Sequence, residues 1–222
     1  MSSASLPFHD RRHAGRVLGG QLGHLRGRPG LLVLALPRGG VAVGFEVAQA
    51  LGAPLDVFIV RKLGFPGHEE YAMGAIASGG VQVINPLPGA QVSPEAMAAV
   101  VAREQEELVR RELLYRGNQP ALAVHGRIVI VVDDGLATGS TMRAALLALR
   151  QQRPAWLVAG VPVGAEETCE QLKGDADEVV CVAMPRPFRA VGLWYSEFPQ
   201  ATDDEVHQLL EDARSHPTAA AH

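Results

Sequence analysis

The sequence predicts an α/β fold in which a twisted parallel sheet is covered by helices on both faces. The first observation is a set of short apolar runs, found at 31–36, 55–60, 127–132, 156–163 and 178–182. They show little alternation of polar and apolar residues, which is typical of strands buried on both faces of a parallel sheet. The second observation is that segments with helical periodicity separate most of these runs, as in repeated strand–helix–strand units.

Length and composition are those of one ordinary globular protein. The 222 residues exceed one typical domain and fall short of two. We therefore expect a single domain over 1–222, with its core at about 28–183 and an appendage built from the N-terminal segment, from 184–222, or from both. Cys169 and Cys181 lack the C-x-x-C spacing of a metal or redox pair, so we expect buried small side chains.

Charge and hydrophobicity argue against two kinds of partner, nucleic acid and a membrane. The net charge is -4, and lysines and arginines are scattered, so nucleic acid is an unlikely partner. No run approaches the roughly 20 apolar residues of a membrane span. We expect a cytoplasmic protein without a membrane partner, and we leave a homo-oligomer open.

The first half of the chain begins with clear signals. Asp10 precedes a helical pattern that extends to Leu25, and the strand at 31–36 ends in the sequence Pro-Arg-Gly-Gly before a helix at 41–51. After the strand at 55–60, residues 61–71 combine glycine, proline and charge in a pattern that favours neither helix nor strand. We predict a mobile loop there.

The remaining elements are read from capping residues and turn signals. Residues 72–86 could form one or two short strands or a hairpin across Gly79 and Gly80. Ser93 and Pro94 predict the start of the longest helix, which Gly117 ends and whose charged run at 103–112 is read as a solvated face. The other predicted helices are 139–151, 165–173 and 203–214, the last with a Thr202–Glu205 capping box, before a frayed tail.

The segment 127–141 carries more polar residues than a turn needs. Its apolar strand runs into Asp133 and Asp134, and glycine and hydroxyl residues follow where the next helix begins. In open α/β sheets, ligands bind outside the carboxyl ends of the strands. The helix start at 139–141, with the hydroxyls around it, suits a phosphate. The two carboxylates need a donor, and the vicinal hydroxyls of a ribose fit. The segment therefore predicts a ribose-5-phosphate site.

Three other interpretations of this segment compete with that one. A P-loop would need one more residue and a lysine, so a nucleoside triphosphatase is unlikely. A receiver domain would need a phosphoacceptor aspartate at a later strand end, whereas Asp175 and Asp177 precede a strand. A polar turn without function is the remaining alternative.

Residues 128–141 closely resemble the signature of the type I phosphoribosyltransferases, which bind 5-phosphoribosyl-1-pyrophosphate (PRPP). The resemblance implies a Rossmann-like parallel sheet of about five strands with a smaller hood over the acceptor. It assigns the ribose hydroxyls to Asp133 and Asp134. It assigns the 5-phosphate to the residues Ala137, Thr138, Gly139, Ser140 and Thr141, and the PRPP-binding set as a whole also includes Gly135 and Leu136.

The family also has a pyrophosphate loop after its first core strand, where this chain carries Pro-Arg-Gly-Gly. By resemblance, Arg38, Gly39 and Gly40 would hold the pyrophosphate, with a strained or cis bond near Pro37 and Arg38 as a hypothesis. Alone, these four residues would indicate only a turn.

The next strand ends in Arg61 and Lys62, and the family implies a flap after it, here at 62–71, that closes over PRPP. Both cations could neutralise pyrophosphate, or they could be solvated loop charges. His68, Glu69, Glu70 and Tyr71 could join the closed site, but no role is assigned to them.

The resemblance implies a magnesium-dependent transfer in which pyrophosphate leaves C1 of the ribose. Arg38, Lys62, Asp133 and Asp134 are the expected catalytic residues, because catalysis is mostly positioning and electrostatics. The cofactor would be Mg²⁺, held mainly by PRPP oxygens, with the Asp pair as further candidate ligands.

The acceptor is the part that the sequence leaves open. The segment 184–200 breaks all periodicity, and Phe188, Trp194 and Tyr195 could stack on an acceptor, although packing onto the sheet is an equal alternative. Related enzymes for 6-oxopurines carry an aspartate where Ala137 stands, which argues against hypoxanthine and guanine. Gly135 also departs from the aliphatic residue usual in the family.

We expect a phosphoribosyltransferase of nucleotide metabolism that uses PRPP and a nitrogenous acceptor, a nucleobase first, as in purine or pyrimidine salvage. The alternative is a regulatory PRPP-binding protein without transferase activity. The intact Arg38-Gly39-Gly40 favours the enzyme, and the negative charge disfavours a regulator that binds nucleic acid.

Overall fold

The computed structural model describes residues 6–65, 68–84 and 92–215, and its centre is a five-stranded parallel sheet. The strand order is β2-β1-β6-β7-β8. The strands of this sheet are β1 (Leu31–Ala35), β2 (Leu55–Val57), β6 (Ile128–Val132), β7 (Trp156–Val163) and β8 (Glu178–Ala183). The helices around it are α1 (Arg11–Gln21), η1 (Gly23–Leu25), α2 (Gly39–Leu51), α4 (Ser140–Gln151), α5 (Glu166–Leu172), η2 (Val191–Trp194) and α6 (Asp203–Ser215).

Alternate residues of each strand enter different apolar layers, because successive side chains of a strand point to opposite faces. In β1, Leu31 and Val33 pack with α1 and α2, whereas Leu32 and Leu34 pack with α4 and α5. Both faces of the sheet are therefore covered, which confirms the predicted α/β fold. The continuous apolar runs in the sequence have this double burial as their cause.

The strand order reverses between β1 and β6. From β1 the chain moves outward to β2 on one side, and from β6 it moves outward through β7 to β8 on the other. Both strands run in parallel, with Ala35 beside Val132, so their carboxyl ends lie next to each other. In such folds, the crevice outside this reversal is where ligands bind.

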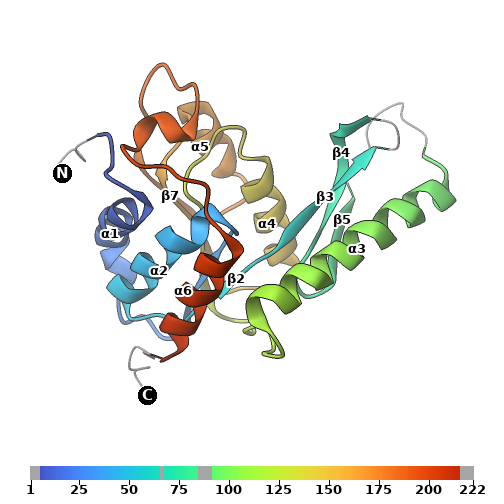
Figure 1. The fold of residues 1–222 in the computed structure, drawn as a ribbon, viewed down its shortest axis with the longest axis horizontal. Helices are drawn as coiled ribbons and strands as arrows, with labels where there is room; N and C mark the ends of the chain where they lie inside the picture. The colour runs from blue at the N-terminus through green and yellow to red at the C-terminus, as the bar shows by residue number, and fades with distance from the viewer. Residues whose placement is uncertain (1–5, 66–67, 85–91, 216–222) are drawn as a thin grey trace.

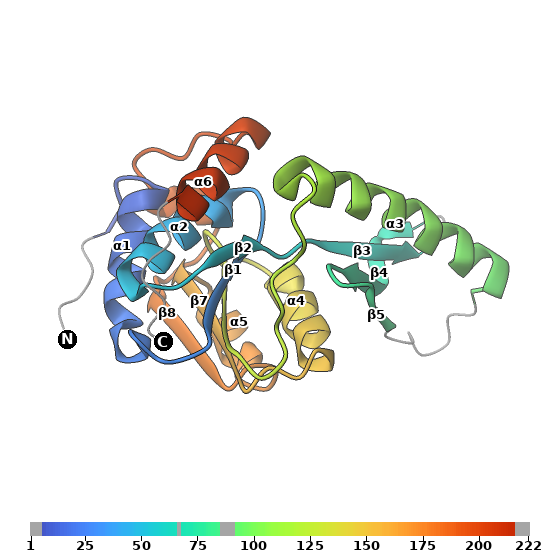
Figure 2. The ribbon, with the colours of Figure 1, turned by 90° about the horizontal axis from the view of Figure 1, so that it is seen from below.

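An arm of antiparallel strands and one long helix stands beside the parallel sheet (Figures 1 and 2). It consists of β3 (Val60–Phe65), β4 (His68–Ala77) and β5 (Val81–Ile84), in the order β3-β4-β5, and of α3 (Pro94–Arg116), which packs on β3 and β4. The other face of this small sheet meets α4.

The arm corrects two expectations. The predicted strand at 55–60 is divided between β2 and β3, and the segment 61–71, expected to be a loop, contributes most of β3 and the start of β4. Glycines and charges suit these strands because their two faces meet different surroundings, α3 on one side and α4 with the loop before it on the other. A hairpin across Gly79 and Gly80 was one of the alternatives kept, and β4 and β5 form it. Residues 66–67, 85–91 and the tail after 215 lie outside the described residues.

A buried ion pair joins the arm to the central sheet. Arg116, at the end of α3, donates from Nε to both carboxylate oxygens of Asp56 in β2, at 2.9 and 3.1 Å. Both residues are about 5% exposed or less. Arg116 also donates to the carbonyl of Val57, and Leu122 N–H donates to Asp56 at 3.2 Å. Nearby, the Tyr115 hydroxyl donates to Asp203 at 2.6 Å, which links α3 to the start of α6.

The chain before α1 and the chain after β8 lie side by side. Phe8 N–H donates to the carbonyl of Trp194 at 2.8 Å, and Ser196 N–H donates to the carbonyl of Phe8 at 2.7 Å. These are the two segments from which we expected the hood. Within the described ranges, no helix is both long enough and apolar enough to cross a membrane.

Replacing Arg116 with Met should destabilise the protein strongly, because the Asp56 carboxylate would stay buried without its cation. Removing one partner of a buried pair typically costs about 3–5 kcal/mol of unfolding free energy. Arg110→Gln, on the exposed face of the same helix, is the control and should have little effect. Urea unfolding measures both, and equal losses would contradict the anchoring role.

Candidate functional site

The loops after β1 and β6 fold against each other at the strand reversal. Leu36 N–H donates to the carbonyl of Val132 at 2.9 Å, and Gly40 N–H donates to the carbonyl of Leu36 at 3.1 Å. A Cβ added to Gly40 would lie 2.8 Å from the carbonyl oxygen of Val132, and one added to Gly39 would lie 2.0 Å from Oδ2 of Asp134. Both glycines are thus required by the close approach of the two loops.

The peptide bond between Pro37 and Arg38 is cis, which agrees with the hypothesis made from the sequence. Arg38 is half-buried, and its side chain makes no hydrogen bond or ion pair with any described residue. It lines a cavity of about 410 Å³ together with residues 200–204, beside the N-terminus of α6. Its guanidinium donors are therefore open to a ligand.

Asp133 and Asp134 each have one carboxylate oxygen held and one open. Asp134 N–H donates to Oδ1 of Asp133 at 2.8 Å, and Nε of Arg11 donates to Oδ2 of Asp134 at 2.8 Å. Within the described residues, Oδ2 of Asp133 and Oδ1 of Asp134 accept no hydrogen bond. Two fixed carboxylates with one open oxygen each are suited to a pair of neighbouring hydroxyl groups.

The environment disfavours the charge of Asp133. Burial, and after it the charge of Asp134, raises the pKa of Asp133 well above its ordinary value, while the guanidinium of Arg11 acts in the opposite direction. The pair is therefore poised to gain from a cation or a hydrogen-bond donor that enters the crevice.

The loop from Gly135 to Gly139 is pinned to α5 and β7. Leu136 N–H donates to the carbonyl of Val163 at 2.9 Å, and Oγ1 of Thr168 donates to the carbonyl of Ala137 at 2.8 Å. Gly139 has a left-handed φ of 67°, and a Cβ there would lie 2.5 Å from Cγ2 of Thr168. The loop is thereby held in one path into α4.

The two helices that begin at the site lack side-chain caps. Asp10, Ser93 and Thr202 cap α1, α3 and α6 with their side chains. No side-chain hydrogen bond caps α2, which begins after Arg38, or α4, which begins after Gly139. The first N–H groups of α4, at its positive dipole end, are left for anions, whereas in α2 the N–H groups of Gly40 and Val41 already donate to the carbonyls of Leu36 and Arg38 at 3.1 Å each.

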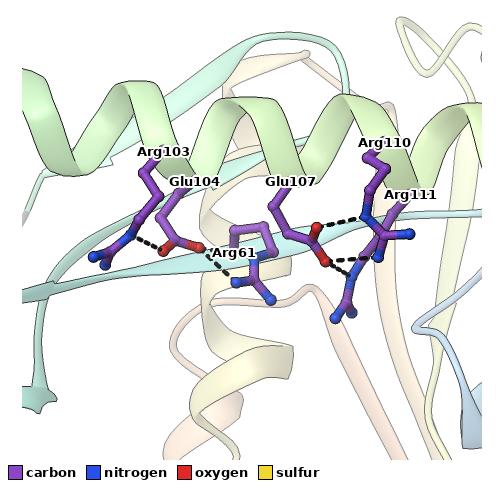
Figure 3. A network of polar contacts seen from close by, with 6 residues as sticks. All are labelled: Arg61, Arg103, Glu104, Glu107, Arg110 and Arg111. Atoms are coloured by element: carbon purple, nitrogen blue, oxygen red, sulfur yellow. Dashed lines mark hydrogen bonds and ion pairs between the residues drawn. The ribbon is translucent and has the colours of Figure 1, made fainter.

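Arg61 and Lys62 point to opposite faces of β3, because neighbouring residues of a strand alternate. Lys62 lines a cavity of about 220 Å³ with Thr138, Gly139 and Ser140. Arg61 faces α3, where its Nε and Nη2 donate to Glu104 at 2.9 and 2.6 Å (Figure 3). Of these two predicted PRPP-binding residues, the structure brings only Lys62 to the loop after β6.

Tyr195 supports the acidic loop from behind. It is 6% exposed, its hydroxyl donates to the carbonyl of Asp134 at 2.6 Å, and its ring stacks on Phe198 with 4.8 Å between centroids. Burial raises the pKa of this hydroxyl. Of the two uses proposed for Tyr195, the structure shows packing. Phe188 and Trp194 join the same apolar cluster as partly buried members.

Gly135 is explained by the segment after β8. A Cβ at this position would lie 2.5 Å from Cγ1 of Val191, in η2. The aliphatic side chain usual in the family would collide there, so this segment packs directly on the acidic loop.

Sequence reasoning missed two residues of the site. Arg11 contacts Asp134 from 123 positions away, and Thr168 holds Ala137 from 31 positions away. Neither carries a local signal, because each acts only through the tertiary fold.

The amino-acid sequence also matches a family of known proteins. A sequence model described as the phosphoribosyl transferase domain matches residues 26–192, which is most of the chain. The chain belongs to the phosphoribosyltransferase family. The resemblance of 128–141 to the type I signature is thereby confirmed.

Three similar proteins extend this comparison to most of the chain. In Mycobacterium tuberculosis, strains CDC 1551 and H37Rv each have a protein assigned by name to the phosphoribosyl transferases. Each is 45% identical over 208 residues, which cover 93% of this chain and 47% of the relative. The chain thus spans about half the length of these curated relatives. The crystal structure of the protein TT1426 from Thermus thermophilus is 43% identical, with a TM-score of 0.83, and the match covers 92% of this chain and 98% of that one.

The side chains at the site fit a weakly held Mg²⁺ better than a protein-built metal cage. Among the described residues, no group of three or more histidine, cysteine, aspartate or glutamate side chains is arranged to hold a metal. The open oxygens of Asp133 and Asp134 are hard ligands of the kind that Mg²⁺ accepts beside substrate phosphates and waters.

Substitution of Gly39 by Ala should force Asp134 away from Arg11, because the new methyl group would overlap Oδ2 of Asp134. We expect a loss of about 1–3 kcal/mol in unfolding free energy, as for other overpacked sites. Gly20→Ala, in α1 with nothing within 4 Å of its Cβ, is the matched control and should be neutral or stabilising. Calorimetric unfolding compares the two, and equal effects would argue against this close approach.

Asp133→Asn should stabilise the free protein increasingly as pH rises. The unfolded chain releases this proton near a pKa of about 3.9, whereas the folded chain retains it to higher pH, so wild type loses stability across that interval. Asparagine cannot ionise and avoids the loss. Urea unfolding at about pH 4 and about pH 8 measures the difference, and a gain that shrinks toward high pH would contradict the raised pKa.

Proposed function

We propose that this protein transfers the phosphoribosyl group of PRPP to a nitrogenous acceptor and releases pyrophosphate. The observation that carries the proposal is the position of the carboxylates of Asp133 and Asp134. Each has one oxygen that accepts no hydrogen bond from a described residue, and the pair lies at the strand reversal of the sheet, between two helix N-termini without side-chain caps. PRPP has hydroxyls at the middle of its length and phosphates at both ends. Membership of the family supports the same substrate.

In this proposal each part of PRPP has its own partners. The open oxygens of Asp133 and Asp134 accept hydrogen bonds from the two ribose hydroxyls. The loop 137–141 takes the 5-phosphate, because its hydroxyls and the N–H groups at the start of α4 are donors beside a positive dipole end. Arg38, with the N–H group of Gly39, takes the pyrophosphate, whereas the N–H of Gly40 is held by Leu36 and Gly40 contributes its lack of a side chain.

Transfer at C1 of the ribose requires few groups other than those that bind PRPP. The bond from C1 to the pyrophosphate oxygen breaks while a bond from C1 to an acceptor nitrogen forms, and the sugar gains positive charge in between. Arg38 stabilises the negative charge on the departing pyrophosphate, Lys62 adds a positive charge beside the loop after β6, and the Asp pair lies beside the sugar. Mg²⁺, held mainly by PRPP oxygens with the Asp pair as further ligands, would neutralise part of the pyrophosphate charge. Arg61 is left out of this set because Glu104 already neutralises it.

The acceptor class is a nitrogenous heterocycle, with a nucleobase as the first candidate. Ala137 is exposed at the loop where related enzymes for 6-oxopurines carry an aspartate, so this chain offers no carboxylate to such a base there. Phe188 and Trp194, as partly buried aromatic side chains, remain the candidates for stacking on the acceptor.

The deciding experiment measures pyrophosphate release from PRPP and Mg²⁺ with a panel of purine, pyrimidine and related ring acceptors. Release that depends on one acceptor would establish the transfer and identify the acceptor together. PRPP binding by calorimetry without release for any acceptor would favour the regulatory alternative. Absence of PRPP binding would overturn the proposal.

Neighbouring residues on β3 provide an internal comparison in this assay. Lys62→Met should lower kcat/KM by about tenfold or more, because it removes a positive charge beside the loop that takes the 5-phosphate. Arg61→Met removes the same charge from the opposite face of the strand and should have a much smaller effect on kcat/KM. If both variants lose equal activity, Lys62 does not act through the crevice.

A further inference from the structure

Arg11 is held where three distant parts of the chain meet. It is the first residue of α1, and its Nε donates to Oδ2 of Asp134 at 2.8 Å. Its Nη1 donates to the carbonyl of Pro199 at 2.6 Å, and its guanidinium carbon lies 3.8 Å from the centre of the Phe198 ring. The side chain is 12% exposed. A long cation fixed by three different contacts has given up most of its freedom, so its position is specific.

The contact with Asp134 lies directly against the turn after β1. A Cβ added to Gly39 would lie 2.0 Å from Oδ2 of Asp134 and 3.1 Å from Nε of Arg11. The Arg11–Asp134 pair therefore sits on the backbone to which the proposed function assigns the pyrophosphate. It is also partly desolvated, with Asp134 17% exposed.

We propose that Arg11 is a positioning residue of the phosphoribosyl site, which fixes the Asp134 carboxylate so that its open Oδ1 receives a ribose hydroxyl. This inference rests on the proposed function. Two adjacent carboxylates repel each other, and without a cation the side chain of Asp134 would turn away from Asp133. Arg11 occupies only Oδ2 and so leaves Oδ1 for the ligand.

Arg11 has a second set of contacts, to the tail, that could make its role merely structural. Nη1 and the face of the guanidinium hold Pro199 and Phe198, whereas Nε holds Asp134. Because different atoms serve the two purposes, variants can separate them.

The test measures the PRPP affinity of the full chain, with Mg²⁺, by calorimetry. Arg11→Met should weaken binding by about 10- to 100-fold, the fold-change that corresponds to losing one hydrogen bond between charged groups. Arg11→Lys keeps the charge at Asp134 and should recover part of this loss. Phe198→Leu loosens the tail but leaves the ion pair, and its affinity should stay within about threefold of wild type. If Arg11 only holds the tail in place, Phe198→Leu should weaken PRPP binding more than Arg11→Lys does.

A double-mutant cycle with Asp134→Asn tests whether Arg11 acts through that carboxylate. If it does, Arg11→Met adds little to the loss already caused by Asp134→Asn, because the coupled partner is gone. Losses that multiply would overturn the positioning role.

The outcomes for this inference and for the proposed function are distinct. Wild type that fails to bind PRPP overturns both. Wild type that binds PRPP, with Arg11→Met binding equally well, overturns the role of Arg11 alone. If thermal unfolding shows that Arg11→Met does not fold, Arg11→Gln, which is also neutral but keeps a donor, replaces it with the same expected loss.

Discussion

The reversal of strand order between β1 and β6 is the constraint on which the candidate site depends. Because the chain leaves these two adjacent strands in opposite directions, a crevice opens between their carboxyl ends. Two loops and two helix N-termini open into it, and glycines let the loops approach within van der Waals distance. The two carboxylates lie at this crevice, and Lys62 and the aromatic tail lie against the loop that carries them. A different strand order would separate the residues without altering any of them.

Much of the central fold could be predicted from the sequence, and the reason is double burial. Each strand of the parallel sheet is apolar on both faces and therefore appears as an uninterrupted run, while the caps at Asp10, Ser93 and Thr202 announce the helices that they begin. The acidic pair and the turn after β1 could be found because their chemistry is concentrated in a few consecutive residues. The cis bond after Pro37 agrees with a hypothesis that rests on the same family resemblance.

The arm and the supports of the site could not be predicted in this way. The strands β3 and β4 have two dissimilar surroundings, so glycine and charge interrupt the apolar pattern that marks a strand elsewhere. Arg11 and Thr168 contact the acidic loop from distant positions, and no local pattern distinguishes them from other polar residues; Tyr195 could be named from its aromatic segment, but its contact with Asp134 could not. Long-range contacts of this kind became visible only in the folded chain. The hydrogen bond from the Tyr195 hydroxyl to the carbonyl of Asp134 is one of these contacts.

The alternation along β3 has a consequence for how this site can change. Arg61 and Lys62 precede the irregular pairing at Leu63 and Gly64, so their facing is set by the regular part of the strand that follows Ile59. Inserting or deleting a single residue there would exchange the two faces. The arginine would then enter the crevice, and the lysine would meet Glu104. The charge of the crevice would be conserved, while a forked guanidinium that binds phosphate through two donors would replace a point charge. In this arm, insertions and deletions could thus retune anion recognition without any substitution at the strand ends.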